Sequence, residues 1–408
     1  MNPLNANSNG PTRIRRAFQL ASVLPSVLPS VLASVLAFQL PFVAPASAAP
    51  SVTPGKVLFD ATKAEMAANA DWVLDTDVNN IGTGTNGAMV VGAGSEANPQ
   101  RFPSPAASGI TATTAETYWK GALSSWGVAL VKRGFSVETL PIGGRITYGD
   151  ATNTQDLSYY GIYVLCEPNI LLTAAEKNAM VRFVADGGGL FVVGDHNASD
   201  RNSDGFDSVD VINDLAASNG VVANPFGIVS NLNSYSLISS FVATSATDPL
   251  INGAAGAVTQ MQYSAGATLT ITGRNAKGAI WRTAAHASND VMVAYSTYGL
   301  GKIVMCGDSS PFDDGTGDTN DTLFAGWAGE VNGDHAQLAI NACLWLNPVV
   351  VTPCPADVDA NHIVNGGDLA MVLQAWGPCS NCAADLDNDN IVSASDLAML
   401  LQSWGACP

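Results

Sequence analysis

Residues 181–196 read VRFVADGGGLFVVGDH, and this stretch decides the fold. Its first part closes a helix that we expect to begin with Thr173 as N-cap, with Glu176 completing a capping box and Gly187 ending it. Its second part, GLFVVGD, is a short apolar run, which predicts a strand buried on both faces. A helix followed directly by a doubly buried strand indicates an α/β fold with a parallel sheet.

The same alternation extends over residues 50–350. We expect strands in KVLFDAT, FSVETLP and YGIYVLCEPN, a helix over 114–134, paired strands in VMVAYSTYGLGKIVMCGD and a closing helix in HAQLAINACLWLN. The part from about 197 to 290 is polar and rich in Ser, Asn and Thr, which indicates an insertion of loops and short strands. The whole region therefore predicts one α/β domain with a mostly parallel sheet flanked by helices.

Polar side chains follow several of the predicted strands. Ligands of open parallel sheets bind beyond the carboxyl ends of the strands, so these side chains should gather at one edge. They are Asp60, Glu167, Asn169, Asp195, His196 and Asp308. Asp195, His196 and Asp308 are the candidate catalytic residues, because carboxylates beside a histidine can move protons. Capping of the following turns is the competing interpretation for these residues.

The loop DRNSDGFD begins like a calcium-binding loop. Asp200, Asn202, Asp204 and Gly205 stand at suitable positions, but the twelfth position falls on Val211, so the pattern is incomplete. A solvated loop with Asx-turns is the favoured interpretation, and a cation held by the two acids is the alternative. The sequence has no G-x-S-x-G elbow, no G-x-G-x-x-G after the first strand and no P-loop.

Two stretches together, VRFVADGGGLFVVGDH and GLGKIVMCGDSSPF, resemble the glutamine-amidotransferase-like superfamily. The resemblance is to its non-amidotransferase branch, near the trehalose-utilisation type proteins, and covers most of 55–348. It implies a flavodoxin-like fold with a site at the strand ends. The amidotransferases of the superfamily carry a Cys nucleophile in a G-x-C-x-G elbow, whereas the matching strand end here reads Gly194-Asp195-His196. Glutaminase activity is therefore not expected.

The C-terminal tail contains one pattern twice. DVDANHIVNGGDLAMVLQAWG begins at Asp357, and DLDNDNIVSASDLAMLLQSWG begins at Asp385. Calcium takes about six to eight oxygen ligands, which a twelve-residue loop supplies from positions 1, 3, 5, 7, 9 and 12. The sequence therefore predicts two calcium ions. The expected ligands are Asp357, Asp359, Asn361, the carbonyl of Ile363, Asn365 and Asp368 in the first loop, and Asp385, Asp387, Asp389, the carbonyl of Ile391, Ser393 and Asp396 in the second.

Each loop also carries signals for local structure. Position 6, where φ is positive and Gly is usual, holds His362 and Asn390, and both residue types tolerate the left-handed region better than most. Val364 and Val392 at position 8 are expected to pair the two loops in a short β-contact. An amphipathic helix should follow each loop, ended by a glycine. Its apolar residues in the first copy are Leu369, Val372, Leu373 and Trp376, and the ending glycines of the two copies are Gly377 and Gly405.

The 28-residue period, Asp at position 12 and the sequence V-x-x-x-D-L resemble the type I dockerin module, over roughly 354–408. The resemblance implies two calcium ions, a fold ordered by metal, and membership of secreted, often polysaccharide-degrading, systems. The implied partner is a cohesin, which reads loop positions 10 and 11, here Gly366-Gly367 and Ala394-Ser395. The basic pair often found in the following helix is absent, so a cohesin-like partner, another cell-surface protein and an intramolecular role all remain open.

Four of the seven cysteines lie within the tail. Cys354 and Cys379 bracket the first copy of the repeat, and Cys382 and Cys407 bracket the second. Three pairings of four cysteines are available, and the matched brackets favour a disulfide around each copy. Buried structural thiols are expected for the other three cysteines, which lie in apolar contexts. These are Cys166, Cys306 and Cys343.

The N-terminus has the features of an export signal. Arg13, Arg15 and Arg16 precede a long apolar run that ends in the small residues APASAAP. We expect 1–49 to be a cleaved signal peptide, using the general secretory or the twin-arginine route. Prolines inside the run argue against a permanent membrane helix, and no later stretch predicts a membrane span in the mature chain. The mature protein is therefore expected outside the cell or in the periplasm.

The charge balance narrows the function. The 35 acids and 17 bases give a net charge of −18, so binding to nucleic acid is not expected. Solubility and binding of divalent cations are the two interpretations of this acidity, and both can hold. Two functions remain open for the residues before the tail. One is non-catalytic, carbohydrate-associated binding, which the missing nucleophile favours. The other is a secreted hydrolase acting on polysaccharide or glycosidic substrates through the strand-end carboxylates.

Overall fold

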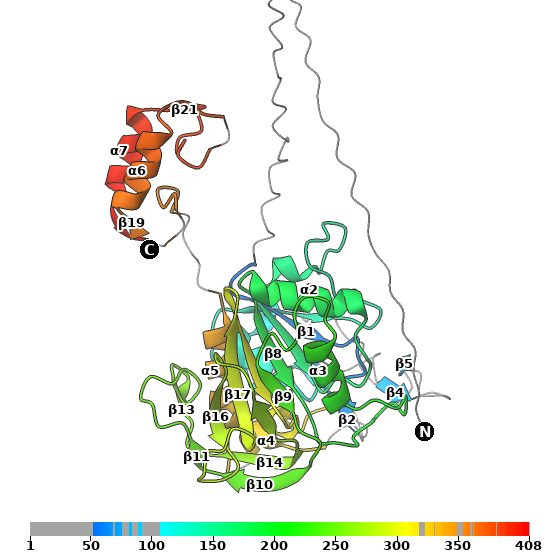
Figure 1. Cartoon of the computed structure of the whole chain (residues 1–408). Helices are drawn as coiled ribbons and strands as arrows, with labels where there is room; N and C mark the ends of the chain where they lie inside the picture. Colours follow the sequence, from blue (N-terminus) through cyan, green and yellow to red (C-terminus); the bar gives the residue numbers. More distant parts are fainter. Residues whose placement is uncertain are drawn as a thin grey trace, which may run out of the picture. The chain divides into compact units, whose positions relative to one another are not determined.

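Figure 1 shows a computed structural model of the chain. It describes residues 52–67, 70–75, 81–83, 89–91, 107–317, 323–329, 331–348, 354–359, 361, 363–380 and 382–407. The expected signal peptide and His362 lie outside these residues. Within the described ranges, no helix has both the length and the apolar character needed to cross a membrane.

A ten-stranded mixed sheet forms the centre of residues 52–348. Five neighbouring strands are parallel: β6 (Ser136–Leu140), β1 (Lys56–Asp60), β7 (Ile162–Cys166), β8 (Gly189–Val193) and β18 (Gly301–Cys306). Numbered along the chain, their spatial order is 2-1-3-4-5, which is the flavodoxin-like order. The predicted α/β class with a mostly parallel core is therefore confirmed.

Antiparallel strands continue the sheet beyond β18. They are β17 (Val291–Tyr298), β16 (Lys277–Trp281) and β11 (Phe241–Val242), while β15 (Leu269–Ile271) joins β17 to β9 (Ile228–Ser230). The pair β17 and β18 is the hairpin that the sequence predicts. Short ladders join β2 (Met66–Ala67) to β3 (Ala70–Asp71), β4 (Ile81–Thr83) to β5 (Met89–Val91), β10 (Tyr235–Ser239) to β14 (Met261–Gly266) and β12 (Asn252–Gly253) to β13 (Gly256–Ala257).

Helices cover both faces of the sheet (Figure 1). On one face lie α1 (Ser124–Val131) and α5 (His335–Leu346), and on the other lie α2 (Ala174–Ala185) and α3 (Ser208–Ala217). Successive strand residues point to opposite faces, so β8 divides its side chains between two cores. Phe191 and Val193 belong to the core with α1 and α5, whereas Leu190 and Val192 belong to the core with α2 and α3. A three-layer arrangement results.

The helix that leads into β8 forms as predicted. The backbone N–H of Thr173 donates to the Glu176 carboxylate at 2.7 Å, and the Glu176 N–H donates to the Thr173 hydroxyl at 3.3 Å. Beyond the helix, Gly187 has a φ of +114°. A Cβ atom on Gly189 would lie 2.6 Å from the carbonyl oxygen of Leu346, so only glycine lets β8 begin against the end of α5.

The continuous helix predicted over 114–134 is wrong. The chain forms the 3₁₀ turn Glu116–Tyr118 and then α1, with an irregular stretch between them. In that stretch the Leu123 N–H donates to the Val73 carbonyl at 3.0 Å, and a Cβ atom on Gly121 would lie 2.4 Å from the same oxygen. A tertiary contact with Val73 therefore replaces the helical hydrogen bonds.

The polar region after β8 contains a helix that the sequence reading missed. Asp207 and Asp210 form a capping box at the start of α3, with the Asp210 N–H 2.9 Å from the Asp207 carboxylate. The buried face of the helix includes Val211, Ile212 and Leu215. Strands β11, β15 and β16 from the same region join the main sheet, so this region builds part of the domain core.

The tail folds as two copies that exchange their ends. Helices α6 (Gly366–Gln374) and α7 (Ala394–Gln402) pack together. Strand β19 (Ile363–Val364) pairs with β22 (Gly405–Ala406), and β20 (Gly377–Pro378) pairs with β21 (Ile391–Val392). The expected direct pairing of Val364 with Val392 is therefore wrong, because the chain leaving each helix lies beside the loop of the other copy.

This exchange also decides the disulfides. The cysteine that ends one copy lies beside the cysteine that begins the other, so the bonds are Cys354–Cys407 and Cys379–Cys382, with Cα–Cα distances of 5.8 and 5.9 Å. The favoured bracketing pairs, Cys354–Cys379 and Cys382–Cys407, are therefore wrong. The other three cysteines are buried and free, as expected.

We predict that Cys354→Ser leaves Cys407 as a free thiol and keeps the Cys379–Cys382 bond, because the two bonds share no cysteine. Alkylation of the denatured, unreduced protein followed by peptide mass spectrometry measures this. The wild-type protein is the control. Alkylated Cys379 in the variant would instead support the bracketing pairs.

Candidate functional site

Glu167 is the centre of the strand-end site. It follows β7, is fully buried, and has a φ of +49°, a left-handed conformation that costs energy in a side-chain-bearing residue. Its carboxylate accepts hydrogen bonds from Trp72 Nε1 at 2.7 Å, Arg201 Nε at 3.0 Å and Ser309 Oγ at 2.5 Å. Glu167 thus ties together segments that are distant in sequence.

Arg201 lies between two acidic strand ends. Its Nη2 donates to the Asp195 carboxylate, while its Nε donates to Glu167. Burial and, after it, the charge of Asp195 raise the pKa of Glu167 well above its usual value, and Arg201 opposes that rise. The guanidinium thus reduces the repulsion between two buried carboxyl groups.

His196 presents one ring nitrogen beside this cluster. Its Nδ1 lies 2.8 Å from the carbonyl oxygen of Asn197, which can only accept, so Nδ1 carries the hydrogen in that bond. The other nitrogen, Nε2, lies 3.7 Å from the Asp195 carboxylate, beyond ordinary hydrogen-bond length. A neutral His196 can therefore accept a proton at Nε2, and Asp195 would stabilise the resulting cation.

Asp308 is buried and acts as a turn cap. Its carboxylate accepts the N–H groups of Ser264 and, at 2.9 Å, Ser310. Burial and, second, the charge of Asp195 raise the pKa of Asp308 to about 7. The capping interpretation therefore describes this residue better than direct contact with a ligand does.

A pocket of about 210 Å³ opens at this edge. Asp195, His196, Arg201 and Ser309 line it, together with apolar Phe324. The Ser309 hydroxyl donates its hydrogen bond to Glu167 and is buried, so it is not positioned to act as a nucleophile. The arrangement can bind a small polar group and move a proton at His196, without a covalent step.

The remaining predicted strand-end residues lie in a neighbouring network. The Asp60 carboxylate accepts the Thr62 hydroxyl at 3.0 Å, and burial followed by the charge of Asp60 raises the pKa of Glu65. Asn169 donates to the Ala64 carbonyl at 3.1 Å. Asp60 and Asn169 therefore support the loop after β1 rather than lining the pocket.

The loop DRNSDGFD forms Asx-turns. The Asp204 carboxylate accepts the N–H of Phe206 at 3.0 Å, which is such a turn, and the Asp200 carboxylate closes the loop by accepting the N–H of Gly205 at 2.8 Å. In the described parts of the chain, these acids belong to no group of three metal-ligating side chains. Arg201 was not among the predicted site residues, although a single base in an acidic loop beside two strand-end carboxylates is a usable signal.

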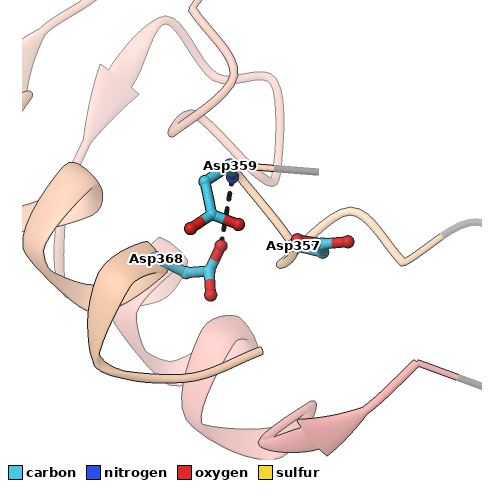
Figure 2. A group of neighbouring side chains, drawn as sticks. All are labelled: Asp357, Asp359 and Asp368. Carbon is cyan, nitrogen blue, oxygen red and sulfur yellow. Dashed lines mark hydrogen bonds between the residues drawn. The ribbon is translucent and has the colours of Figure 1, made fainter. Parts of the chain in front are cut away.

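The first tail loop brings three carboxylates together (Figure 2). Oxygen atoms of Asp357, Asp359 and Asp368 all lie within 4.8 Å of one another. Asp368 also accepts the N–H groups of Val358 at 2.7 Å and Asn365 at 2.9 Å, which joins both ends of the loop. These bonds outweigh burial and hold the pKa of Asp368 below its usual value.

The second loop repeats this geometry. Asp385, Asp387 and Asp396 form the equivalent group within 4.8 Å. Asp396 accepts the N–H groups of Leu386 and Ser393, both at 2.7 Å. The same contacts therefore recur in both copies.

The donor set fits a hard divalent cation. Each group offers clustered carboxylate oxygens and no sulfur or imidazole nitrogen, which suits calcium. Asn390 at position 6 has a φ of +70°, the conformation expected there. The other predicted side-chain ligands shape the loops: Asn365 and Ser393 cap α6 and α7, and Asn361 and Asp389 accept the N–H groups of Ile363 and Ile391.

Comparison with known families identifies the tail. Residues 355–403 match the family model of the dockerin type I domain, so the chain carries a small C-terminal dockerin domain. Domains of this family bind calcium and use cohesins as partners, and the two acidic groups fit the calcium chemistry. A search of curated proteins found no match.

Solved structures are similar to the larger part only distantly. The mmIFT52 N-terminal domain is 15% identical with a TM-score of 0.41, covering 73% of this chain and 100% of that one. A ThuA-like protein from Parabacteroides merdae is 12% identical with a TM-score of 0.37, covering 72% and 90%. A β-galactosidase from Bacillus circulans sp. alkalophilus is 12% identical with a TM-score of 0.29, covering 53% and 26%. The strand order and register establish the fold independently of these likenesses.

We predict that Asp308→Asn weakens the pH dependence of stability. The folded pKa of about 7 lies above the unfolded value of about 3.9, so the folded state binds more protons between these values. The contribution of Asp308 to the free energy of unfolding should fall as pH rises from about 4 to 7, by up to ~4 kcal/mol. Denaturant unfolding across this range measures the difference.

Asp204→Asn is the matched control, because Asp204 is an exposed aspartate on a loop. It should keep the pH dependence of the wild type. An equal slope in the wild type and in Asp308→Asn would contradict a raised pKa at Asp308.

Proposed function

We propose that the chain is a secreted, calcium-binding modular protein. Its dockerin domain tethers the α/β domain to a protein partner, and the α/β domain binds carbohydrate. The observation that carries the proposal is the pair of equivalent acidic groups, Asp357, Asp359 and Asp368 in one loop and Asp385, Asp387 and Asp396 in the other.

Two ions, one in each loop, agree with this geometry. Three carboxylates within 4.8 Å repel one another, and a divalent cation converts that repulsion into attraction. The acids lie at loop positions 1, 3 and 12, so binding would hold the loop against the first turn of the helix. Calcium would therefore stabilise the tail by mass action.

A protein partner agrees with the surface of the tail. Part of each amphipathic stripe packs inward through Val372 and Leu400, which are fully buried. The rest faces outward in matched positions, and side chains exposed by 37–53% form one set in each copy. They are Ile363, Met371, Leu373 and Trp376 in the first copy, and Ile391, Met399, Leu401 and Trp404 in the second. Exposed aromatic and apolar side chains of this kind favour protein contacts.

Calcium titration of the whole protein tests the proposal. We expect the wild type to bind two ions and Asp359→Ala or Asp387→Ala to bind one, because each variant removes a carboxylate from one group. Calorimetry with metal analysis measures the number of ions. Asp204→Ala is the control and should still bind two.

Partner binding gives a second readout of the same variants. A double Asp359→Ala/Asp387→Ala variant should lose calcium-dependent binding to a cohesin panel. A wild-type protein that binds no calcium at millimolar concentration would overturn the proposal.

A hydrolase is the second candidate function. The observation that favours it is His196, whose Nε2 faces Asp195 at 3.7 Å at the edge of the pocket beside β8. Such a pair could activate water without a covalent intermediate. Carbohydrate would then be a substrate.

A panel of polysaccharides and aryl glycosides tests this candidate. If the pair is catalytic, His196→Ala should lower the rate by about 10²–10⁴-fold, the range for removing a general base. Lys120→Ala, at an exposed residue outside this pocket, serves as the control. Product analysis that detects no hydrolysis by the wild type would exclude the candidate for the substrates in the panel.

A further inference from the structure

A second, larger cleft lies away from the strand-end pocket. It has a volume of about 890 Å³ and lies between the loop 243–249 and the antiparallel strands β16 and β17. Clefts of about 300–1,000 Å³ are typical of sites for small organic ligands. The size of this cleft suits two or three sugar rings.

Stacked rings form one wall. The rings of Trp281 and His286 are parallel within 3°, with centroids 4.2 Å apart. Trp281 also lies against Gly278, where an added Cβ atom would approach its ring to 2.4 Å. His286 is exposed and has a φ of +49°, so the backbone adopts an unfavourable conformation while presenting this ring.

A second aromatic pair lines the same cleft. Tyr295 and Trp345 meet edge to face with centroids 5.1 Å apart. The Tyr295 hydroxyl donates to the Asp248 carboxylate at 2.7 Å, and Asp248 also accepts the N–H of Leu250 at 3.0 Å. Burial and then Asp248 raise the pKa of Tyr295, so this hydrogen bond persists at neutral pH. This pair is therefore preorganised.

Two cations line the same cleft. Arg274 and Lys277 are exposed, and neither forms an ion pair within the described part of the chain. Other bases do form such pairs, as Lys177 does with Asp214 at 2.7 Å and Arg282 with Asp290 at 2.6 Å. On a protein with a net charge of −18, two cations that have no acidic partner among the described residues and lie beside aromatic rings favour an anionic ligand.

We propose that this cleft binds an acidic saccharide, a uronate oligosaccharide, with its rings against the aromatic pairs and its carboxylates on Arg274 and Lys277. Thr244, Thr247 and Asn275 add hydroxyl and amide groups for the sugar hydroxyls. The inference rests on the carbohydrate role proposed above and gives that role a ligand class and a place. The cleft is separate from the candidate proton-transfer site at His196.

Calorimetry on the whole protein with calcium tests it, using tri-galacturonate, tri-mannuronate and tri-guluronate as probes. Galactotriose is the uncharged counterpart of the first probe. We expect at least one uronate to bind at least about tenfold more tightly than galactotriose, since charge-assisted hydrogen bonds would be lost with the neutral sugar. Sodium sulfate should give no comparable binding.

Variants then locate the site. Arg274→Gln/Lys277→Gln should lower uronate affinity at least about tenfold, and His286→Ala should lower it by a smaller factor. All three residues are exposed, and circular dichroism verifies folding. The matched control is Lys120→Gln/Arg145→Gln, which removes two exposed bases outside the cleft and should leave affinity unchanged.

The outcomes separate this inference from the broader proposal. Saccharide binding that the Arg274→Gln/Lys277→Gln variant leaves intact overturns the cleft assignment and keeps carbohydrate binding. Binding of galactotriose as strong as that of every uronate overturns the acidic ligand class. Sulfate binding as strong as uronate binding reduces the site to an anion site. Absence of binding by every saccharide overturns the cleft assignment and the proposed carbohydrate role of the α/β domain, while the calcium titration tests the tail separately.

Discussion

The contact of Arg201 with Glu167 and Asp195 is the interaction on which the larger domain depends most. It joins the ends of β7 and β8 to the loop that follows β8, while Trp72 and Ser309 attach two further segments to Glu167. Burying two carboxylates in one place is costly without a cation. Arg201 therefore allows the polar ends of the parallel strands to lie close together inside the protein, and the pocket at His196 lies beside them.

The tail also has to offset the repulsion between neighbouring carboxylates, and it does so in another way. Its loops also concentrate carboxylates, but within the described residues no Lys or Arg lies in the tail. Backbone N–H groups partly stabilise Asp368 and Asp396, and the remaining negative charge requires a cation from solution. The larger domain thus includes its compensating charge in the sequence, whereas the clustered acids of the tail have the chemistry to take a cation from solution.

Short sequence patterns were sufficient to predict local structure where that structure depends only on residues close together in the chain. The capping box of Thr173 and Glu176, the buried strand at 189–193 and the positive φ of Asn390 were all predictable from short patterns. The break before α1 was not, since it depends on the Val73 carbonyl, which is distant in sequence.

The same limit applies to the candidate sites. The disulfide pairing depends on how two similar copies exchange their ends, and a repeat alone gives no sign of that exchange. Asp195 and His196, which were predicted from their place at a strand end, line a pocket. The position at a strand end could not distinguish Asp195 and His196 from the turn cap Asp308. The N–H groups that Asp308 accepts come from the turn after β18 and from β14.

The Cys354–Cys407 bond makes the tail a covalent ring. Its cysteines are 53 residues apart, so by the loop-entropy model the closure reduces the freedom of the unfolded tail by about 4 kcal/mol. When calcium leaves, the two copies cannot drift apart, because the first and last strands stay joined beside one another. The covalent closure thus preserves the placement of the two copies beside one another, whether or not the acidic loops hold a metal ion.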